Sequence, residues 1–498
     1  MDGDFYGVDR HAINGKFSPP ERHVDVLVVG AGAAGCAAAI EAAKAGATVL
    51  LVDENPVSAA LMGLDTPLYY GGRMTNAVQN QGRMLEQVFN ADPALQAAFE
   101  AGVDVALATY AWGVFVNGPG VQSLPSPVVG LADEERSWTC GFTSLILATG
   151  ARDLALAFPG WDQPGVMGAG ALRALMNHYD AFAGRRILFL GSGELALSTA
   201  LLAIDRGVEV AALVEVLDQP QGPSDLVAQV KAHGVPILTS RVITGALGGI
   251  DGVHSATLAP VGGGAAQTIA CDTVCQAIGM VPAIELLDAA GGKLVASSER
   301  GGFAPVLKDR TATSLANVFV AGACAGLSGQ FDHYAYRMSW MRAVVAASDP
   351  SVIVCQCEGV TRADLLGVQP PAYLDRPPAM AARDIGGLLA DGPVNQDQIK
   401  RLTRACMGAC QARRCREQVA LLLAMASQTP LADVPLAGFR APVRPLPLKV
   451  LAAWDEPEAM GDGWDVWLGI AGQWTPYDDI GTEREALHPS VLGGGREG

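Results

Sequence analysis

The stretch "HVDVLVVGAGAAGCAAAIEAAKAGATVLLVDEN", residues 23–55, predicts the fold of the chain. An apolar run leads into a glycine turn, an alanine-rich helix and a second apolar run, which is typical of buried strands in a parallel sheet. The glycines Gly30, Gly32 and Gly35 give the spacing G-x-G-x-x-G, and Asp53 ends the second strand. A strand before, a helix after and an acid at this distance together indicate a dinucleotide-binding unit.

Each part of the glycine motif has a physical role. Gly30 permits the sharp turn, Gly32 lets a pyrophosphate approach the backbone, and Gly35 lets helix and strand pack closely. The helix N-terminus offers free N–H groups and a positive dipole end to phosphates. Asp53 can accept hydrogen bonds from a ribose diol. The alternative interpretation of the motif is that its glycines serve only close packing. The predicted cofactor-binding residues of this unit are Gly30, Gly32, Ala33, Ala34, Gly35, Asp53 and Glu54.

A second unit of the same kind begins at "GRRILFLGSGELALSTALLAIDRGVEVAALVEV", residues 184–216. Gly191 and Gly193 are present, and Ala196 stands at the third glycine position, which is an accepted variant. Glu215 closes the following strand and could hold a ribose. The sequence leaves open whether this second site holds a nicotinamide nucleotide, another nucleotide or none. Its candidate residues are Gly191, Gly193 and Glu215.

Two further segments join these units. "TSLILATGAR" (143–152) is an apolar strand that breaks at Thr149 and Gly150, and "ANVFVAGACAGLSG" (316–329) runs into a glycine turn at Gly322. This order resembles the two-dinucleotide-binding-domain flavoproteins of the glutathione-reductase-like superfamily over about residues 24–345. The resemblance implies an FAD domain split around an inserted nicotinamide-type domain, with Thr149, Gly150 and Gly322 beside the FAD.

The chain departs from that superfamily at two places. Family members place an aspartate after the last "AG", where it contacts the flavin, but this chain has Ala323 and Cys324. Disulfide reductases also carry a C-x-x-C or C-x4-C pair at the flavin, and no such pair stands at the expected places here. We therefore expect FAD to bind without the aspartate contact, and we do not expect thiol–disulfide chemistry.

Composition limits the partners and the compartment. The 498 residues carry a formal charge of -17 and a pI near 4.8, which argues against nucleic acid or an anionic membrane as a partner. Neither a signal peptide nor a transmembrane segment is expected. Ten cysteines in such a chain point to reduced thiols, a metal or redox work. The expected location is the cytoplasm, with a peripheral position at the inner membrane through a partner as an alternative.

A cysteine-rich segment follows residue 350. "SVIVCQCEGVTRADLLGV" (351–368) contains C-x-C, and "IKRLTRACMGACQARRC" (399–415) contains C-x4-C. A disulfide between neighbours in C-x-C would be strained, so clustered thiolates indicate a cation. Zinc takes four thiolates tetrahedrally, and a [2Fe–2S] cluster also takes four. The candidate ligands are Cys355, Cys357, Cys410 and Cys415, with Cys406 as a fifth.

These two stretches resemble the bacterioferritin-associated-ferredoxin-like [2Fe–2S] domain. The version with C-x-C-E-x-V-T occurs in FAD-containing alpha subunits of heteromeric opine, proline and hydroxyproline dehydrogenases and of hydrogen cyanide synthase, and the trailing "FRAPVRPLPL" (439–448) fits that group. The resemblance favours a [2Fe–2S] cluster over zinc. Cys406 stands where the family often has glycine, and Ala412 replaces a second glycine, so Cys406 could replace Cys410 as a ligand.

The same resemblance implies what the chain does. It implies an electron-transferring subunit whose partner is a D-amino-acid-oxidase-like flavoprotein beta subunit that oxidises a secondary amine or amino acid. A small third subunit, FMN at the subunit interface and a distal electron acceptor are further features that it allows. The alternatives are a self-contained NAD(P)H-dependent flavin and iron–sulfur reductase, and a binding module that holds zinc. No catalytic residue is assigned, because the sequence shows no paired-carboxylate, Ser/His or Cys/His constellation.

The expected fold class is α/β, with two Rossmann-like dinucleotide-binding domains of glutathione-reductase type, a small helical [2Fe–2S] domain and a C-terminal arm. The predicted divisions are the first segment of the FAD-binding domain (24–160), the inserted NAD-type domain (161–285), the second segment of the FAD-binding domain (286–350), the cluster domain (351–428) and the arm (429–498). His333 is expected to pack and not to catalyse. The arm is either a cover or a contact between subunits, and it carries Trp454, Trp464, Trp467 and Trp474.

Overall fold

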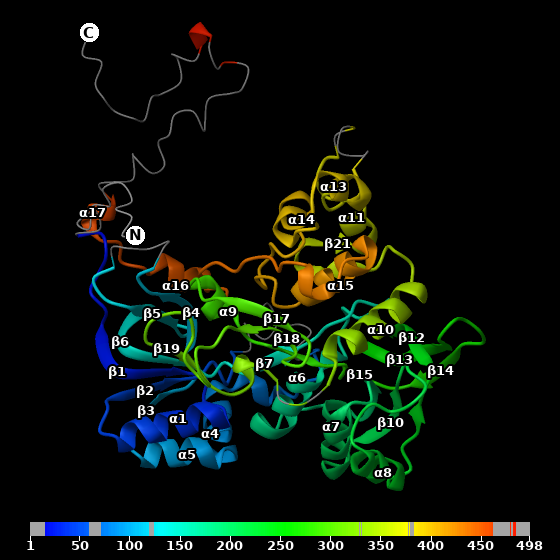
Figure 1. The fold of residues 1–498 in the computed structure, drawn as a ribbon. Helices are drawn as coiled ribbons and strands as arrows, with labels where there is room; N and C mark the ends of the chain where they lie inside the picture. Colours follow the sequence, from blue (N-terminus) through cyan, green and yellow to red (C-terminus); the bar gives the residue numbers. More distant parts are fainter. Residues whose placement is uncertain are drawn as a thin grey trace.

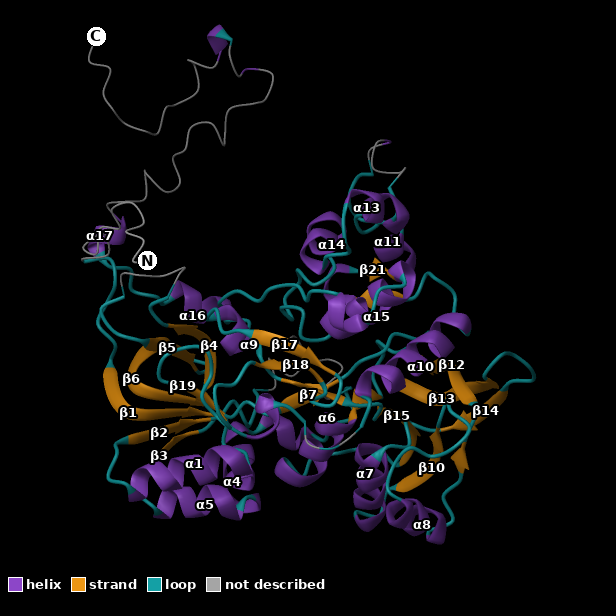
Figure 2. Ribbon diagram, in the orientation of Figure 1, coloured by secondary structure: helices purple, strands orange, loops and turns teal. Residues whose placement is uncertain are grey.

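The computed structural model describes residues 15–58, 71–118, 124–327, 329, 331–376, 378, 383–461, 479 and 482–484. Within these residues the chain forms two sheet-containing bodies side by side, with a largely helical module of residues 351–428 lying over the region where they meet (Figure 1). We call this region the cysteine module. The expected α/β class, with two Rossmann-like units and a helical C-terminal region, is confirmed (Figure 2).

The first body is built on a sheet with the strand order β3-β2-β1-β6-β5-β4, and β19 lies beside β6. The strands β3, β2, β1, β6 and β19 run parallel, whereas β4, β5 and β6 form an antiparallel meander. Helices cover one face of this sheet (Figures 1 and 2). The elements are β1 (Arg22–Val29), α1 (Ala33–Lys44), β2 (Val49–Val52), η1 (Asn76–Gln79), α4 (Gln81–Ala91), α5 (Pro93–Glu100), β3 (Asp104–Ala106), β4 (Tyr110–Phe115), β5 (Val128–Ala132) and β6 (Ser137–Leu147).

Strand β1 lies in the middle of the first sheet, as its apolar sequence predicts. Leu27 and Val28 point to opposite faces, and both are 0% exposed, so the strand is buried on both sides. The parallel strands β1, β2 and β6 end at one edge of the sheet, and the first glycine turn follows there. Helix α1 then packs back on the sheet through the small buried residues Gly35, Cys36 and Ala39.

The second body repeats this plan. Its parallel strands follow the order β11-β10-β9-β15-β8, and the antiparallel sheet β12-β13-β14 lies next to them. The second glycine turn follows β9 and leads into α7. The elements are β8 (Val166–Gly168), α6 (Ala169–Arg173), η2 (Ala174–His178), β9 (Arg186–Leu190), α7 (Glu194–Asp205), β10 (Glu209–Val214), α8 (Ser224–Ala232), β11 (Ile237–Leu238), β12 (Arg241–Gly249), β13 (Gly252–Pro260), β14 (Gln267–Ala270) and β15 (Thr273–Gln276).

The chain leaves the first body and returns to it through two paired strands. β7 leads out and β16 leads back, and the two run antiparallel. The following residues complete the first body, because β19 adds to β6 in the first sheet. The elements of this region are β7 (Ala151–Asp153), β16 (Met280–Pro282), α9 (Glu285–Ala289), β17 (Leu294–Ser297), β18 (Gly302–Pro305), β19 (Val318–Val320), η3 (Gly322–Ala325) and α10 (His333–Ala346).

The cysteine module begins with the short β20–β21 hairpin and continues through helices. Thr361 caps α11 together with Asp364 in a reciprocal capping box, which fixes the start of the helix directly after the β20–β21 hairpin. Residues 437–447, which we call the strap, run from this module across the first body to α16 (Figure 1). The elements are β20 (Ile353–Cys355), η4 (Gln356–Glu358), β21 (Val360–Thr361), α11 (Arg362–Leu366), α13 (Ile385–Asp391), α14 (Gln396–Thr403), α15 (Arg416–Ser427), η5 (Leu431–Asp433), α16 (Leu448–Ala452) and α17 (Glu458–Gly461).

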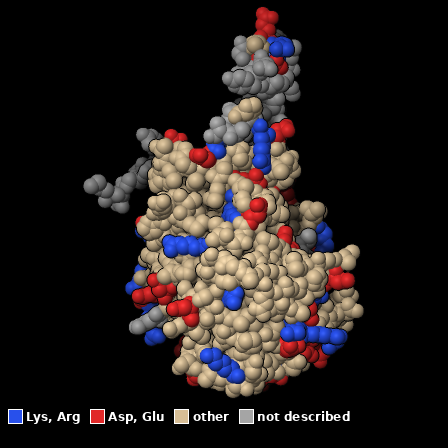
Figure 3. All heavy atoms as spheres, turned by 90° about the vertical axis from the view of Figure 1, so that its right-hand side faces the viewer, with Lys and Arg blue, Asp and Glu red and all other residues tan. Residues whose placement is uncertain are grey.

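The surface mixes charges of both signs. On the face shown in Figure 3, the Lys and Arg side chains drawn lie apart from one another, with Asp and Glu between them. No helix among the described ranges is long and apolar enough to cross a membrane. Of the tryptophans in the predicted arm, Trp454 is 46% exposed. Trp464, Trp467 and Trp474 lie outside the described residues.

Candidate functional site

The first glycine loop has the geometry that its spacing predicts. Gly30 has φ +107°, and a Cβ there would overlap the carbonyl oxygen of Ala148. A Cβ on Gly35 would overlap the carbonyl oxygen of Gly30, so the helix lies directly on the turn. Gly32 differs, because a Cβ there would meet nothing within 4 Å. The chain therefore leaves open space in front of the position at which a pyrophosphate would approach.

The N-terminus of α1 faces the same open space. Gly32 is the N-cap residue, no side chain caps the helix, and its first turn carries no acidic residue. The first-turn N–H groups near Ala33 and Ala34, together with the positive end of the helix dipole, can therefore receive an anion. This region of the structure suits a phosphate group.

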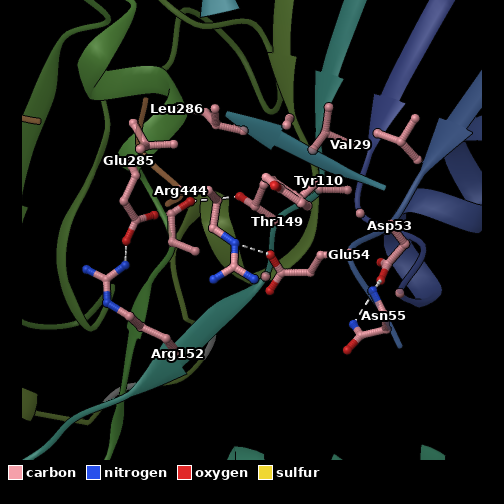
Figure 4. Close-up of a pocket in the computed structure, with 18 of the residues that line it drawn as sticks. Val29, Asp53, Glu54, Asn55, Tyr110, Thr149, Arg152, Glu285, Leu286 and Arg444 are labelled. Carbon is pink, nitrogen blue, oxygen red and sulfur yellow. Dashed lines mark hydrogen bonds and ion pairs between the residues drawn. The ribbon is translucent and has the colours of Figure 1, made fainter. Parts of the chain in front are cut away.

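Two adjacent acids follow β2, and they do different things. The Oδ2 atom of Asp53 accepts a 2.5 Å hydrogen bond from the Ala31 backbone N–H, and its Oδ1 atom accepts bonds from the Asn55 backbone and side chain, both at 2.8 Å. Burial raises the pKa of Asp53, and these hydrogen bonds counteract the shift. Both acids line a cavity, and Glu54 forms a 2.8 Å ion pair with Arg444 of the strap. Figure 4 shows Asp53 turned toward Asn55, and Glu54 turned toward Arg444.

A cavity of about 340 Å³ lies in front of the first glycine loop, within the usual range for ligand sites. Its walls come from the loop and the end of β2, the start of β4, the turn at Thr149 and Gly150, the start of α9, the Cys410–Cys415 loop and the strap. Thr149 donates a 2.7 Å hydrogen bond to the carbonyl of Ala283, which fixes that turn. Gly150 has φ +71°, so a side chain there would be strained.

Arginines from distant segments reach the cavity. Arg152 is ion-paired with Glu285 inside it (Figure 4) and also with Glu417 of α15, at 3.1 Å. Arg413, on the loop between two of the candidate ligands, lines the cavity as well. The cysteine module and the nucleotide-type cavity are therefore in direct contact.

The glycine turn at Gly322, in the segment 316–329, lies against α1 and not in the cavity wall. A Cβ on Gly322, which has φ +73°, would lie 2.8 Å from the Cβ of Ala34, so this glycine allows the close approach. Ala323 stands directly after the last "AG", where the superfamily is expected to have an aspartate, and Cys324 follows it; the Cys324 thiol donates to the carbonyl oxygens of Leu147 at 2.9 Å and Ala321 at 3.3 Å. Burial raises the pKa of Cys324, so the thiol does not replace the missing carboxylate as an anion.

The second glycine loop has the same backbone plan. Gly191 has φ +109°, and a Cβ there would lie 2.7 Å from the carbonyl oxygen of Ala277. A Cβ on Gly193 would meet nothing within 4 Å, and Ala196, in the first turn of α7, is 0% exposed. The local geometry is thus equivalent to that of the first loop.

The surroundings of the second loop are different. Glu215, the acid in the ribose-binding position, is 0% exposed. Its Oε2 atom accepts hydrogen bonds from Ser192 Oγ at 2.6 Å and from the Tyr336 hydroxyl at 2.8 Å, and burial raises its pKa. The backbone N–H groups of Gln221 and Gly222 donate to Ser192 at 3.0 and 2.9 Å. The chain's own residues therefore bond to Ser192 of this loop and occupy its acid, while the space in front of Gly193 stays open.

The candidate ligand cysteines come together in the cysteine module. The Cys415 sulfur lies 3.7 Å from that of Cys355 and 3.6 Å from that of Cys406. Cys410 interacts with Cys357 and Cys415, and hydrogen bonds from these two thiols lower the pKa of Cys410. All of these cysteines are unpaired, and Cys357 is exposed while the other members of the group are buried.

Local backbone features hold the thiols in place. A Cβ on Gly408 would overlap Cys357, so the glycine lets the two cysteine stretches meet. Gly359 has φ +62°, which allows the turn after Cys357, and Cys406 has φ +71°. No set of three or more His, Cys, Asp or Glu side chains in the described part of the chain has the arrangement of a complete metal site. The thiols are therefore gathered but not arranged around one point.

Comparison with known proteins places the fold in a family. The profile of the pyridine nucleotide-disulphide oxidoreductases matches residues 24–349. The chain belongs to this family. The sarcosine oxidase A3 domain matches residues 372–455, which include most of the cysteine module and the strap.

This pyridine nucleotide-disulphide oxidoreductase is similar to named subunits of several enzymes. The "A" component of opine oxidase from Agrobacterium tumefaciens (strain Ach5) is 25% identical over 86% of this chain and 91% of its own length. The alpha subunit of sarcosine oxidase from Rhizobium meliloti (strain 1021) is 29% identical over 84% of this chain, which spans only 41% of that relative. The HcnB subunit of hydrogen cyanide synthase from Pseudomonas protegens is 25% identical over 88% of this chain and 99% of its own. L-proline dehydrogenase from P. horikoshii shares the fold, with a TM-score of 0.55, 19% identity and coverage of 87% and 81% of the two chains.

Family membership makes the chain an oxidoreductase and supports a flavin or nucleotide cofactor. Within this pyridine nucleotide-disulphide oxidoreductase, the cavity residues that the sequence did not single out are Arg152, Glu285, Arg413 and Arg444. Arg152 follows the Thr149–Gly150 turn, so its place in the sequence was a usable signal. Arg444 lies in the stretch "FRAPVRPLPL" (439–448), which the sequence singled out without indicating that it reaches the cavity.

His333 opens α10 and contacts the ring of Phe331, with ring centroids 5.0 Å apart. Burial, followed by the positive charge of Arg337, lowers the pKa of His333 to about 4, so the ring is neutral near pH 7. A packed, neutral ring agrees with the expected packing role.

Proposed function

We propose that this chain is the electron-transferring subunit of a heteromeric dehydrogenase that oxidises a secondary amine or amino acid. In this proposal a D-amino-acid-oxidase-like beta subunit oxidises an opine, proline, hydroxyproline or sarcosine-type substrate at its own flavin. The relatives named as subunits of opine oxidase, sarcosine oxidase and hydrogen cyanide synthase support an assembly of several chains. A small third subunit, together with FMN at the interface, belongs to the same proposal.

One observation carries the proposal: the gathered thiols lie next to the nucleotide-type cavity. Arg413 stands on the loop between Cys410 and Cys415 and also lines the cavity, and Arg152 joins the cavity to α15 through Glu417. Two electron carriers must be close to exchange electrons, and this arrangement brings their two predicted sites into contact. The same arrangement supports the proposed division of the chain into two FAD-binding segments, an inserted domain and a cluster domain.

The residues present support both proposed cofactors, with the thiols gathered but not arranged around one ion. Two thiolates on one tetrahedral ion, each about 2.3 Å from it, lie about 3.7 Å apart, and the Cys415 sulfur is 3.7 Å from Cys355 and 3.6 Å from Cys406. Bound flavin would exchange one or two electrons, and a bound [2Fe–2S] cluster would exchange one at a time. Zinc would suit the same thiols, but the adjacent nucleotide cavity favours an electron carrier.

The ligands that we propose are Cys355, Cys357, Cys410 and Cys415, with Cys406 as the alternative to Cys410. For FAD we propose the first glycine loop, the N-terminus of α1, Asp53, Glu54, Thr149, Gly150 and Gly322. Asp53 would then act by holding the loop through Ala31, and Glu54 would face the nucleotide.

The covered second loop separates this proposal from a self-contained NAD(P)H-dependent reductase. Glu215 is bonded to Ser192 and Tyr336, and the backbone of Gln221 and Gly222 is bonded to Ser192. A nicotinamide nucleotide would have to displace these groups. The backbone geometry at Gly191 and Gly193 is that of a nucleotide-binding loop, which favours the NAD(P)H-dependent reductase. NADH and NADPH are therefore included in the test.

The test compares two electron sources. The purified chain, loaded with flavin and iron, is expected to reduce a dye slowly or not at all with NADH or NADPH. Together with its flavoprotein partner, the same chain is expected to reduce the dye when a secondary amine is added. Iron analysis should give about two irons and no zinc per chain. Rapid NADH-dependent turnover by the chain alone would overturn the proposed role as a subunit, and zinc in place of iron would overturn the cluster.

A further inference from the structure

The strap connects the cysteine module with the nucleotide-type cavity. At its start, backbone N–H groups donate to side chains of α14 and α9, and at its far end Val443 donates a 2.8 Å hydrogen bond to the carbonyl of Trp112 in β4. Three backbone contacts therefore hold the strap, and Arg444 follows directly after the last of them, at Val443. The first two anchors are Ala437 N–H to Gln396 at 2.9 Å and Phe439 N–H to Asp288 at 3.1 Å.

Arg444 is buried at the edge of the cavity and carries its charge there. Its side chain is 5% exposed, and its Nε atom lies 2.8 Å from Oε2 of Glu54, whose side chain is 44% exposed. The guanidinium carbon also lies 5.7 Å from the centre of the Tyr110 ring. A buried cation needs a counter-charge, and Glu54 supplies one. The two side chains point toward each other in the cavity (Figure 4).

The ion pair places Glu54, and not Asp53, in the position to meet a ligand. Both carboxylate oxygens of Asp53 already accept hydrogen bonds from the chain, from Ala31 and from Asn55. The ion pair of Glu54 uses Oε2, and a carboxylate has a second oxygen that can accept from a hydroxyl. A glutamate without a partner would rotate freely and would lose that freedom on binding. The pair with Arg444 removes this cost in advance.

We propose that Arg444 is a positioning residue that orients Glu54 to accept the ribose hydroxyls of an adenine nucleotide in the cavity. The inference rests on the proposed nucleotide site and deepens it. The ribose acceptor is then set by a residue of the strap, which belongs to the other end of the chain. It also follows that the cavity is complete only when the strap is in place.

The test measures discrimination between two ligands. The full chain, freed of bound flavin, is titrated with ADP and with 2′,3′-dideoxy-ADP, which lacks the ribose hydroxyls. Because hydrogen bonds to a charged acceptor would be lost with the dideoxy compound, the wild-type chain is expected to bind ADP about tenfold more tightly than 2′,3′-dideoxy-ADP. The quantity compared between variants is this ratio of the two Kd values. In Arg444→Gln and in Glu54→Gln this ratio is expected to fall to about one. Arg444→Lys should keep part of it, because the charge remains.

Lys449→Gln is the matched control. Lys449 lies just after the strap and forms a 2.8 Å ion pair with Glu135, but both side chains are exposed and neither lines the cavity. The ratio should be unchanged in this variant. Because the ratio compares two ligands on one protein, a general loss of stability does not alter it. The double variant Arg444→Gln/Glu54→Gln should show the same affinity ratio as either single variant, since the two residues act as a unit.

Each outcome decides the inference. An unchanged ratio in Arg444→Gln would overturn it. A ratio lost in Asp53→Asn but kept in Glu54→Gln would overturn it as well, by making Asp53 the acceptor. If the wild-type chain binds neither ADP nor FAD, the proposed nucleotide site itself fails. A ratio lost in Arg444→Gln and Glu54→Gln and kept in Lys449→Gln supports it.

Discussion

The two glycine loops have the same backbone geometry and different surroundings. In both, the first glycine has a positive φ and lies against a carbonyl, whereas a Cβ on the second glycine would meet nothing within 4 Å. In front of the first loop lies a cavity of about 340 Å³. Over the second loop lie Tyr336, Gln221 and Gly222, which bond to Ser192 or to Glu215. A glycine motif thus determines the turn, while side chains from elsewhere determine whether a ligand can reach it.

The largest expected effect comes from a side chain placed in each loop. Gly32 and Gly193 both have ordinary negative φ, so valine is sterically possible on the backbone at either position. Gly32→Val would fill the space of the pyrophosphate and should raise the Kd for FAD by at least about 100-fold. Gly193→Val should leave FAD binding unchanged. Flavin absorbance of the purified proteins measures both, and equal loss of yellow colour in the two variants would contradict the comparison.

The second prediction concerns the thiols beside the first cavity. Cys357→Ser removes an exposed thiol of the gathered group, so iron should fall from about two per chain to near background while FAD is kept. Cys271→Ser changes a buried cysteine of the second body and should keep both cofactors. Iron analysis and the visible spectrum report the result. Unchanged iron in Cys357→Ser would show that the ligand assignment is wrong.

A third prediction compares one tyrosine in each unit. Tyr336→Phe removes a hydrogen bond from the buried carboxylate of Glu215 and should lower the free energy of unfolding by about 1–3 kcal/mol. The Tyr110 hydroxyl, in the first unit, has no hydrogen-bond partner among the described residues. Tyr110→Phe should therefore change the free energy of unfolding by less than about 0.5 kcal/mol. Denaturant unfolding of the chain without nucleotide measures both, and equal losses would contradict the closed second site.

The smallest effect is a pH dependence at the junction of the two bodies. Burial raises the pKa of Asp153 to about 6, and hydrogen bonds from the N–H groups of Gly170 and Ala171 counteract it. The folded chain then keeps a proton that the unfolded chain has lost, so this group lowers stability as pH rises from about 4 to 6. Asp153→Asn should make this decline shallower. The loss of unfolding free energy between pH 4 and pH 6 should shrink by about 1 kcal/mol, a small amount because the side chain is partly exposed and solvent screens its charge. Unfolding midpoints at pH 4 and pH 6 provide the measurement, and an equal decline in both proteins would contradict the shift.

The sequence predicted what depends on neighbouring residues. The turn at Gly30 and the close packing at Gly35 each follow from a spacing of a few residues, and each is confirmed. The grouping of the cysteines also followed, because the C-x-C and C-x4-C patterns restrict where thiols can lie. Cys406 could not be separated from Cys410 by spacing, and both thiols contact the group.

What the sequence could not predict depends on contacts between distant segments. Tyr336 covers the second loop from α10, and no local pattern connects it with Glu215. Arg444 reaches Glu54 from the strap, which has no regular secondary structure and therefore no periodicity to interpret. The proposed ribose acceptor, Glu54 in place of Asp53, depends on which of the two carboxylates the Ala31 N–H reaches, and adjacent acids look equivalent in a sequence.

The strap also has a consequence for how the protein is made. Glu54 lies near the start of the chain and Arg444 near its end, and a chain is synthesised from its N-terminus, with its domains folding as units. The first body can therefore fold on the ribosome while Arg444 is still to be synthesised, and at that stage the nucleotide site has no strap over it. Under the proposed role of Arg444, a cofactor that arrives then meets a Glu54 that is not yet oriented, whereas one that arrives later meets the ion pair already formed. The oriented acceptor therefore exists only once the C-terminal part of the chain has been made.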